Sequence, residues 1–422
     1  MKYTVAFFAL YICVIANGQS QTKRVLFLGN SYTNVNNLPQ MLADVAASTG
    51  DTLEFDSNTP GGYTLKGHST NATSLAKLKA GNWDYVVLQE QSQLPSLPIE
   101  QVETEVFPYA KLLDSIINAE NACAETVFYM TWGRKNGDAS NCAAWPPVCS
   151  YLGMDSLLSL RYRMMADSNN AIVSPVGAVW KYIRQNFSQI ELYQADESHP
   201  SVAGTYAAAC SFYTALFRKD PTQITFNATL STTDAANIRA ATKLMVYDSL
   251  MNWHIGEYDP VANFTYTVSD VYQIAFKNTS ENATDFYWEF GDENTSISIN
   301  PTHVYQSTGS YLVSLIASKC GISDTTFQII NITAVGAHEL SGKEHFIIYP
   351  NPATSFLTVN KKLSANATYV IYNLSGQEIQ TGIISNSGEQ IAVSVLSEGI
   401  YFLQLFDNIK SLGQQKFMKT TE

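Results

Sequence analysis

Basic residues, histidine and cysteine are all scarce in this chain of 422 residues. Its 25 lysines and arginines are outnumbered by 37 aspartates and glutamates, which gives a net charge of −12. This balance argues against nucleic acid as a partner, because binding nucleic acid needs a cationic surface. The histidines and cysteines form no CxxC pair and no cluster with metal-ligand spacing, so we expect neither a metal nor another cofactor.

Long apolar runs are absent, apart from one at the N-terminus. Apolar residues make up 45% of the chain and charged residues 15%, which excludes a wholly disordered chain and a polytopic membrane protein. The apolar run at 5–15 is too short to span about 30 Å of hydrocarbon comfortably, and small residues follow it at Ala16 and Gly18. We therefore predict that residues 1–20 are a cleaved secretory signal.

The predicted export of the protein affects how its cysteines are expected to pair. Removal of the signal leaves five cysteines, an odd number, so at least one thiol is free or bridges to another molecule. Cys142 and Cys149 flank a Pro-containing loop, and in an exported protein we expect them to form a local disulfide.

The length suggests roughly three domains at about 150 residues each. Between residues 24 and 252, short apolar runs alternate with helical patterns, which is the signature of βαβ units. This pattern predicts an α/β domain at 21–257 with a mainly parallel sheet. The expected strands are 24–29, 52–56, 84–89, 126–131 and 171–176, and the expected helices are 38–48, 100–117, 154–167, 202–217 and 234–253.

Past residue 258 the sequence changes to aromatic and β-branched runs separated by Asn, Ser, Thr and Gly, with no convincing helix. Short strands with frequent turn residues are typical of small β-sandwiches. We predict two all-β sandwich domains, at 258–335 and 341–422, joined by a linker at 336–342.

A serine stands where a catalytic nucleophile would be exposed. Ser31 follows the apolar run 25–28 and the pair Gly29-Asn30, at a turn that leaves backbone N–H groups free before the next helix. Taken alone, this tripeptide is better explained as an ordinary turn at the end of a strand.

A carboxylate and an imidazole occur together later in the α/β region. Asp196 and His199 lie three residues apart in a loop closed by Pro200. The carboxylate can turn back onto one imidazole nitrogen, fix its tautomer and leave the other nitrogen free as a base. A lone histidine is more often structural, but this spacing before a helix favours a catalytic role.

Together these blocks resemble the SGNH (GDSL-like) hydrolase superfamily over residues 23–253. Its first block appears as Gly29-Asn30-Ser31, with Asn30 where the commoner pattern has Asp. Its second block is a glycine whose amide joins the oxyanion hole, and Gly62 matches it best. Its last block is 196–199. The resemblance implies a three-layer α/β/α fold.

The remaining block departs from the family. Many relatives have Gly-x-Asn-Asp after a strand, whereas this chain has Gln89-Glu90-Gln91-Ser92-Gln93, which looks more like the carbohydrate-esterase and sialate-acetylesterase branches. A side-chain amide can still donate to an oxyanion. Gln89 fits the strand end best, Gln93 fits the count from Asp84, and Gln91 is a third candidate. Glu90 is either a supporting partner or a solvated charge.

The resemblance implies a serine esterase that needs no metal. Ser31 would attack an ester carbonyl, His199 would take its proton, and Asp196 would orient and stabilise His199. The amides of Ser31 and Gly62 and a glutamine, with Gln89 preferred, would hold the oxyanion.

Two further residues follow another expected strand and so face the same edge of the sheet. Trp132 could stack on a sugar ring and Arg134 could pair with a carboxylate. Packing of the tryptophan in the core and solvation of the arginine are the competing interpretations, and we favour them.

The C-terminal third carries two further resemblances. Phe286-Tyr287-Trp288-Glu289-Phe290-Gly291-Asp292 and the pattern up to residue 334 resemble the PKD domain, for which a spacer role is the default. Residues 341–420, which begin with Ile348-Tyr349-Pro350-Asn351-Pro352, resemble the type A sorting domain of the type IX secretion system. That resemblance implies a Bacteroidetes-type bacterium, passage through the outer membrane by the type IX machinery, and removal of the domain as the protein is released or attached to the surface.

These observations predict a secreted or surface-held carbohydrate esterase that removes acetyl or other acyl groups from glycans. A short-chain lipase or general esterase is the alternative within the enzyme class. An adhesive or glycan-binding surface protein without catalysis is the alternative outside it, but such a protein has no need of Ser31, Asp196 and His199 together.

Overall fold

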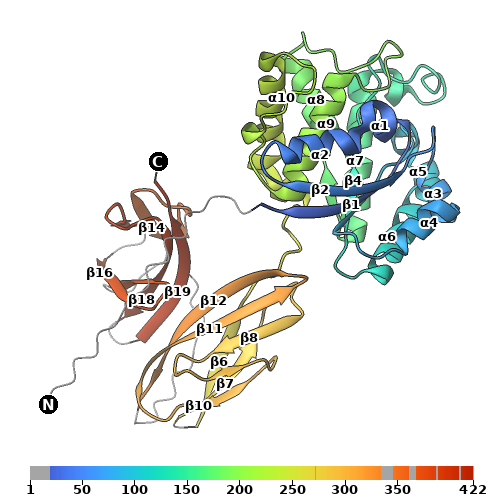
Figure 1. Cartoon of the computed structure of the whole chain (residues 1–422). Helices are drawn as coiled ribbons and strands as arrows, with labels where there is room; N and C mark the ends of the chain where they lie inside the picture. Colours follow the sequence, from blue (N-terminus) through green and yellow to red (C-terminus); the bar gives the residue numbers. More distant parts are fainter. Residues whose placement is uncertain are drawn as a thin grey trace. The chain divides into compact units, whose positions relative to one another are not determined.

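The structure is a computed structural model that describes residues 20–270, 272–333, 346–360, 367–385, 388–407 and 410–421. The chain forms two compact units, Met1–Tyr258 and Asp259–Glu422 (Figure 1). The predicted signal lies outside the described residues except for Ser20, and the predicted linker at 336–342 lies wholly outside them.

The first unit contains a five-stranded sheet in the order β2-β1-β3-β4-β5, and each pair of neighbours is parallel. Its strands form because their apolar runs are buried on both faces, as in Val25–Leu28, where every side chain is fully buried. The predicted α/β class with a parallel sheet is confirmed. The strands are β1 Thr22–Leu28, β2 Thr52–Asn58, β3 Tyr85–Leu88, β4 Glu125–Tyr129 and β5 Ile172–Ser174.

The helices pack as two groups, α2 with α8, α9 and α10, and α3 with α4, α5, α6 and α7, which cover the sheet (Figure 1). This arrangement confirms the expected three layers. The helices are α1 Ser31–Asn34, α2 Leu38–Ala47, α3 Leu65–Thr70, α4 Ala72–Leu78, α5 Ile99–Glu105, α6 Phe107–Glu120, α7 Tyr151–Asn169, α8 Val176–Asn186, α9 Val202–Phe217 and α10 Thr232–Met245.

Two helix predictions need correction, and further helices were not among those expected. The expected helix at 100–117 is two helices, because Pro108 has no N–H and lies in the first turn of α6, where none is needed. The expected helix at 234–253 ends at Met245 and continues as a 3₁₀ helix, Tyr247–Trp253. The helices α3, α4 and α8 were not expected; α3 and α4 are short and begin at polar caps, Thr64 and Asn71.

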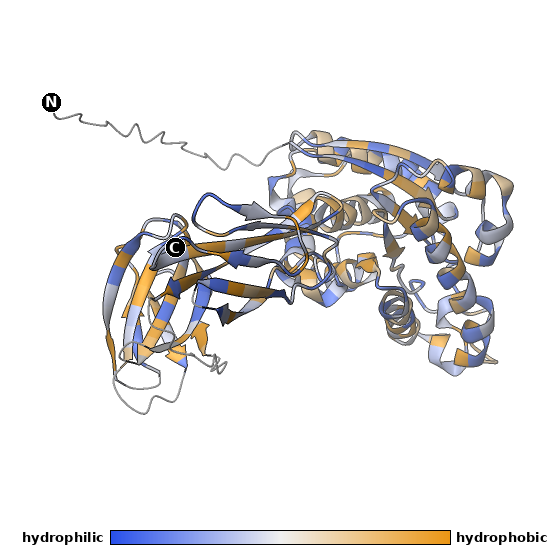
Figure 2. Cartoon of the chain, turned by 90° about the horizontal axis from the view of Figure 1, so that it is seen from below, coloured by the Kyte–Doolittle hydropathy of each residue, from blue (hydrophilic) through white to orange (hydrophobic). Residues whose placement is uncertain are grey.

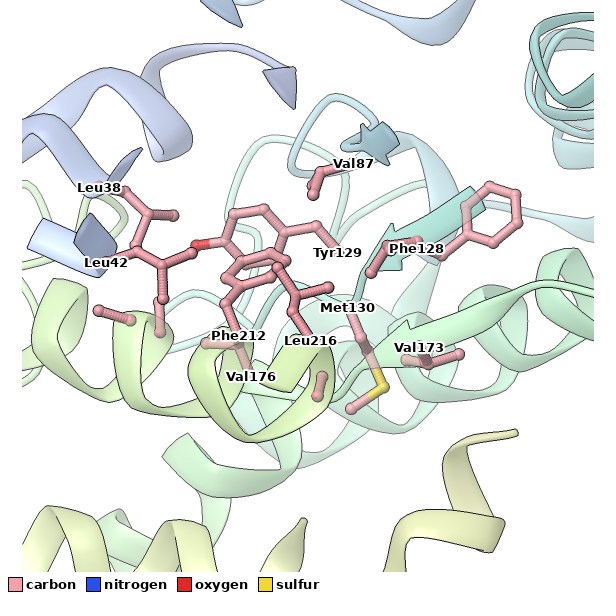
Figure 3. Close-up of a cluster of buried hydrophobic side chains, with 14 of the residues drawn as sticks. Leu38, Leu42, Val87, Phe128, Tyr129, Met130, Val173, Val176, Phe212 and Leu216 are labelled. Atoms are coloured by element: carbon pink, nitrogen blue, oxygen red, sulfur yellow. The ribbon is translucent and has the colours of Figure 1, made fainter. Parts of the chain in front are cut away.

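The core between the sheet and one helical layer is aromatic and aliphatic. Figure 3 shows Tyr129 of β4 lying between Leu38 and Leu42 of α2 and Phe212 of α9, all of them fully buried. Burial contributes about 1.5–3 kcal/mol for each such side chain. This packing fixes the carboxyl end of β4 against α2, the helix that follows the Ser31 turn.

The second unit consists of antiparallel sheets, in the orders β10-β7-β6, β12-β11-β8-β9, β13-β14-β17 and β16-β15-β18-β19. Two separate cores lie in it, one around Trp288 and one around Leu403. Hydrophilic and hydrophobic residues alternate along many of its strands (Figure 2), as the expected all-β domains require. The strands are β6 Phe264–Asp270, β7 Gln273–Asn278, β8 Asp285–Glu289, β9 Thr295–Ser296, β10 Thr302–Val304, β11 Gly309–Lys319, β12 Ile322–Ile332, β13 Ile347–Tyr349, β14 Phe356–Asn360, β15 Ala367–Asn373, β16 Glu378–Ile384, β17 Gln390–Ala392, β18 Gly399–Asp407 and β19 Lys410–Lys419.

The cysteines agree with the expectation for an exported chain. Cys142 and Cys149 form the predicted disulfide. Cys210 on α9 is a free thiol and is fully buried. Among the described helices, none has the length and apolar character needed to cross a bilayer.

Close packing of α9 against α8 gives a stability prediction. A Cβ atom at Gly204 would lie 2.3 Å from the Leu192 carbonyl oxygen and 2.4 Å from the Trp180 ring. We expect Gly204→Ala to reduce the free energy of unfolding by about 1–3 kcal/mol, measured by urea denaturation, because the ring or the helix must move. Gly61→Ala is the matched control, since a Cβ there meets nothing within 4 Å. Equal stability of the two variants would contradict the prediction.

Candidate active site

The turn after β1 presents Ser31 at the carboxyl edge of the sheet. Asn30 is the N-cap of α1, and its side-chain oxygen accepts a hydrogen bond of 3.1 Å from the Tyr32 amide. Position 29 requires glycine because two side chains approach its backbone closely: a Cβ there would lie 2.5 Å from Thr33 Oγ1 and 2.7 Å from Gln89 Oε1. The turn therefore has a defined shape before any substrate binds.

His199 lies on a hairpin-like loop between α8 and α9. The Gln194 amide donates to the His199 carbonyl at 2.8 Å, and the Ser201 amide donates to the Leu192 carbonyl at 2.9 Å. Inside this loop, Asp196 Oδ1 accepts from the amides of Ser198 (3.1 Å) and His199 (3.0 Å). The loop thus holds the Asp196 carboxylate in place through its own backbone.

The structure brings Ser31, His199 and Asp196 into one hydrogen-bonded row. His199 Nε2 lies 2.8 Å from Ser31 Oγ, and His199 Nδ1 bonds to Asp196 Oδ2. Burial raises the pKa of Asp196, but hydrogen bonds from the His199 ring and from backbone amides outweigh this and leave its pKa below the ordinary value. An ionised Asp196 keeps the proton on Nδ1, so Nε2 can accept the hydroxyl proton.

Stacked aromatic rings support the histidine loop. Tyr32 meets the His199 ring edge-on at 5.4 Å between centroids and stacks on Trp132 at 4.7 Å, and Trp132 stacks on Trp180 at 3.7 Å. Trp132 Nε1 donates to the Ser198 carbonyl at 3.1 Å, and the Tyr32 hydroxyl lies 2.7 Å from Ser198 Oγ. Trp132 is fully buried, so the packing interpretation of this residue is correct and the sugar-stacking one is wrong.

Asn30 joins three segments of the site, and sequence reasoning missed this role. Its Nδ2 donates to the carbonyls of Tyr63 (3.0 Å) and Glu90 (3.3 Å), and its Oδ1 accepts from Gln89 Nε2 at 2.7 Å as well as from Tyr32. The side chain is only 2% exposed. An aspartate carboxylate could not donate to the two carbonyls, which explains why an amide stands at this position.

Gln89 does not fit the predicted oxyanion role. It is fully buried, and its Nε2 donates to Asn30 Oδ1 (2.7 Å) and to the Glu90 carbonyl (3.0 Å). Its Oε1 accepts from the Asn30 amide (3.1 Å) and from Thr33 Oγ1 (2.7 Å). Both amide hydrogens are therefore used inside the fold, and Gln89 connects the end of β3 to the Ser31 turn instead.

The other two glutamines remain candidates. Gln91 Nε2 donates one hydrogen to Gln93 Oε1 at 3.1 Å, and Gln93 Nε2 donates one to Asp138 Oδ2 at 2.8 Å. Each amide nitrogen carries a second hydrogen. Both side chains are only partly buried.

Gly62 lies in an exposed turn after β2. Its φ of +67° favours glycine, whereas a Cβ would meet nothing within 4 Å. The turn is linked to the nucleophile segment because the Tyr63 carbonyl accepts from Asn30. The role of the Gly62 amide in an oxyanion hole stays a prediction.

His68 gives the same region a second link that the sequence did not reveal. Its Nε2 lies 2.9 Å from the Gly29 carbonyl, and its Nδ1 lies 2.7 Å from Ser74 Oγ. Burial lowers the pKa of His68 to about 4, so the ring is neutral at physiological pH. A neutral ring with Nε2–H donating ties α3 to the turn before Ser31.

Arg134 does not lie free in solvent. Its guanidinium pairs with the buried carboxylate of Asp138 at 3.3 Å, and Asp138 also accepts from Gln93 and Asn141. Within the described part of the chain, no group of three His, Cys, Asp or Glu side chains could hold a metal ion.

Comparison with known proteins assigns the C-terminal part of the chain. Residues 259–333 match the PKD domain, and residues 347–420 match the "Secretion system C-terminal sorting domain". The chain carries a PKD domain and a secretion sorting domain. Both predicted resemblances are thus confirmed, and the sorting domain directs the protein through the type IX machinery to the cell surface or beyond.

The relatives are similar over parts of the chain only. A microbial collagenase of Vibrio alginolyticus is 38% identical over 69 residues, which span 14% of this chain and 8% of that protein. A DUF4886 family protein of Bacteroides uniformis is 17% identical with a TM-score of 0.47, over 55% of this chain and 95% of its own. A proposed SGNH hydrolase of Slackia heliotrinireducens is 29% identical with a TM-score of 0.39, over 46% and 97%.

The contacts of Asn30 predict the effect of one conservative change. In Asn30→Asp, a carboxylate would face the carbonyl oxygens of Tyr63 and Glu90 in place of an N–H donor. We expect the free energy of unfolding to fall by about 3 kcal/mol, because a buried charge loses its partners. Urea denaturation at neutral pH measures this. Asn37→Asp, at an exposed helix cap, is the control with the same charge change. Equal stability of the two variants would contradict the hydrogen-bonding role assigned to Asn30.

Proposed function

We propose that this protein is a secreted serine ester hydrolase that removes acetyl or other short acyl groups from carbohydrates. The observation that carries the proposal is the row from Ser31 Oγ through His199 to Asp196, with 2.8 Å between the hydroxyl and Nε2. A hydroxyl within hydrogen-bond distance of a base, which is oriented in turn by a carboxylate, is the arrangement of an activated nucleophile.

The reaction proceeds in two halves. Ser31 Oγ attacks the ester carbonyl while His199 Nε2 takes its proton, and the protonated ring, stabilised by Asp196, then gives that proton to the departing sugar hydroxyl. Water next attacks the acyl-serine with His199 again as the base, which releases the carboxylic acid and restores Ser31. No metal or cofactor enters either half.

The oxyanion is held by hydrogen-bond donors at the same edge. The Ser31 amide lies at the start of α1, and the Gly62 amide lies in a turn bonded to the Ser31 segment through Asn30. The third donor is the side-chain amide of Gln91 or Gln93, in place of Gln89. Each donor of this kind contributes about 3–4 kcal/mol to lowering the barrier.

The location to which the protein is exported supports the proposal of a carbohydrate substrate. The sorting domain takes the protein out of the cell, where acylated polysaccharides are accessible. The PKD domain is a separate β-domain between the hydrolase unit and the sorting domain and serves as a spacer.

Removal of the nucleophile tests the chemistry. The purified protein is expected to cleave p-nitrophenyl acetate, and Ser31→Ala is expected to lower kcat/KM at least about 1,000-fold, because the acyl-serine intermediate forms on Ser31 Oγ. Ser115→Ala, an exposed serine on α6, is the control. Hydrolysis that persists in Ser31→Ala would overturn the proposal.

The substrate class needs its own measurement. The protein is expected to release acetate from acetylated polysaccharides, and its kcat/KM on p-nitrophenyl esters is expected to fall as the acyl chain lengthens beyond acetyl. Acetate release is measured with an enzymatic assay. A preference for long acyl chains, with no acetate released from any polysaccharide, would favour a lipase instead.

A further inference from the structure

A buried carboxyl group lies beneath the site and has no part in the proton transfers described above. Glu90 is the second residue after β3, and its side chain is fully buried. Its neighbours in sequence are Gln89, which supports the Ser31 turn, and Gln91, a candidate oxyanion donor. A buried acid needs an explanation, because burial of a charge is costly.

Both carboxyl oxygens of Glu90 accept from backbone amides, one in the distant segment at Leu65 and one in the next residue of its own segment, Gln91. Oε2 accepts from the Leu65 amide at 3.2 Å, and Oε1 accepts from the Gln91 amide at 2.5 Å. Leu65 is the first residue of α3, three positions after Gly62. The carboxyl group therefore bridges the Gly62 turn and the Gln91 turn.

The main chain of Glu90 is fixed as well. Its carbonyl accepts from Asn30 Nδ2 (3.3 Å) and Gln89 Nε2 (3.0 Å), and its amide donates to the Tyr162 hydroxyl (3.3 Å). Tyr162 is a fully buried residue of α7. The main chain of Glu90 is thus anchored to the Ser31 turn and to the helical layer, while its side chain bonds to the start of α3 and to the amide of the next residue, Gln91.

We propose that Glu90 is a positioning residue, whose carboxyl group holds the segments of Gly62 and Gln91 in place around Ser31. The inference rests on the proposed ester hydrolysis, in which these segments supply oxyanion donors. Displacement of such donors by about 1 Å is sufficient to cost a large factor in rate.

The ionisation state of Glu90 decides how strongly it holds the two amides. Both oxygens of a carboxylate are strong acceptors, whereas in the acid form one oxygen carries a proton and is a weaker acceptor for the N–H that faces it. Burial raises the pKa of Glu90 to about 8, the amides of Gln91 and Leu65 oppose this, and the charge of Glu105 adds to it. Tyr162 is the other titratable group that faces it. We expect kcat to rise with pH around 8.

The principal test is Glu90→Gln in the full-length protein with p-nitrophenyl acetate. The amide removes one acceptor, so above pH 8, where wild-type Glu90 is ionised, we expect kcat to fall about 10-fold to 100-fold with KM nearly unchanged, and the rise of kcat around pH 8 to disappear. Glu103→Gln, an exposed residue of α5, is the matched control and is expected to keep both. An unchanged kcat and pH profile in Glu90→Gln would overturn the inference.

A second readout does not depend on catalysis. Hydrogen exchange measured by mass spectrometry is expected to speed up in segments 61–70 and 89–94 of Glu90→Gln and to stay unchanged in α9. If the wild-type protein cleaved no ester but this pattern appeared, the proposed function would fail while the bridging contacts of Glu90 stood. Unchanged exchange in both segments would overturn the inference.

The ionisation of Glu90 also predicts how the stability of the folded protein depends on pH. Because the folded-state pKa of Glu90 lies above its ordinary value of 4.5, the folded protein holds an extra proton between these values. The contribution of Glu90 to stability is therefore complete below about pH 4.5 and is lost as the pH rises through about 8. Glu90→Gln is expected to flatten this decline in urea denaturation; an unaltered decline would count against the inference.

If Glu90→Gln failed to fold, Leu65→Pro would address the same contact from the other side. It removes the N–H that Oε2 accepts, at the first helical position, where proline is tolerated. We expect it to lower kcat on p-nitrophenyl acetate by about 10-fold. A Leu65→Pro protein that folds with wild-type kcat would overturn the inference.

Discussion

The position of the Ser31 turn depends on complete hydrogen bonding of two buried amide side chains, Asn30 and Gln89. All eight of their hydrogen-bonding positions are used. Most of these contacts join segments about 30 to 60 residues apart; the others are the bond from the Tyr32 amide to Asn30, which closes the Ser31 turn, and the bond from Gln89 to the adjacent Glu90 carbonyl. In a buried environment an unpaired polar group is costly, so the segments must sit where the amides can reach them. This constraint holds Ser31, the proposed nucleophile, in position.

The aromatic stack and Glu90 also hold segments of the site in place. The rings of Tyr32, Trp132 and Trp180 fill the space below the His199 loop with few rotatable bonds, so the loop backbone has a rigid support. Glu90 differs, because it retains a group whose charged form burial opposes. In the proposed role of Glu90, two backbone amides are fixed and stability falls at alkaline pH, as is common where function and stability conflict.

The fold could be predicted from the sequence because its apolar runs and helical patterns are local signals. The strand at Val25–Leu28 and the helix Val202–Phe217 are such cases. The break before Phe107 and the short helices α3 and α4 were missed, since a proline in a first turn and two polar caps are weak signals. In the site, Ser31, Asp196 and His199 could be named because their motifs together resemble the SGNH hydrolases. The roles of Asn30, Gln89 and His68 could not, because they depend on contacts between distant segments.

The central claim is that His199 activates Ser31, and covalent labelling tests it most directly. The protein would be treated with diisopropyl fluorophosphate, which modifies activated serines, and the site would be located by peptide mass spectrometry. The account predicts a single adduct on Ser31 that forms far more slowly in His199→Ala, although Ser31 is still present. Labelling of another residue, or labelling of Ser31 at the same rate without His199, would contradict it.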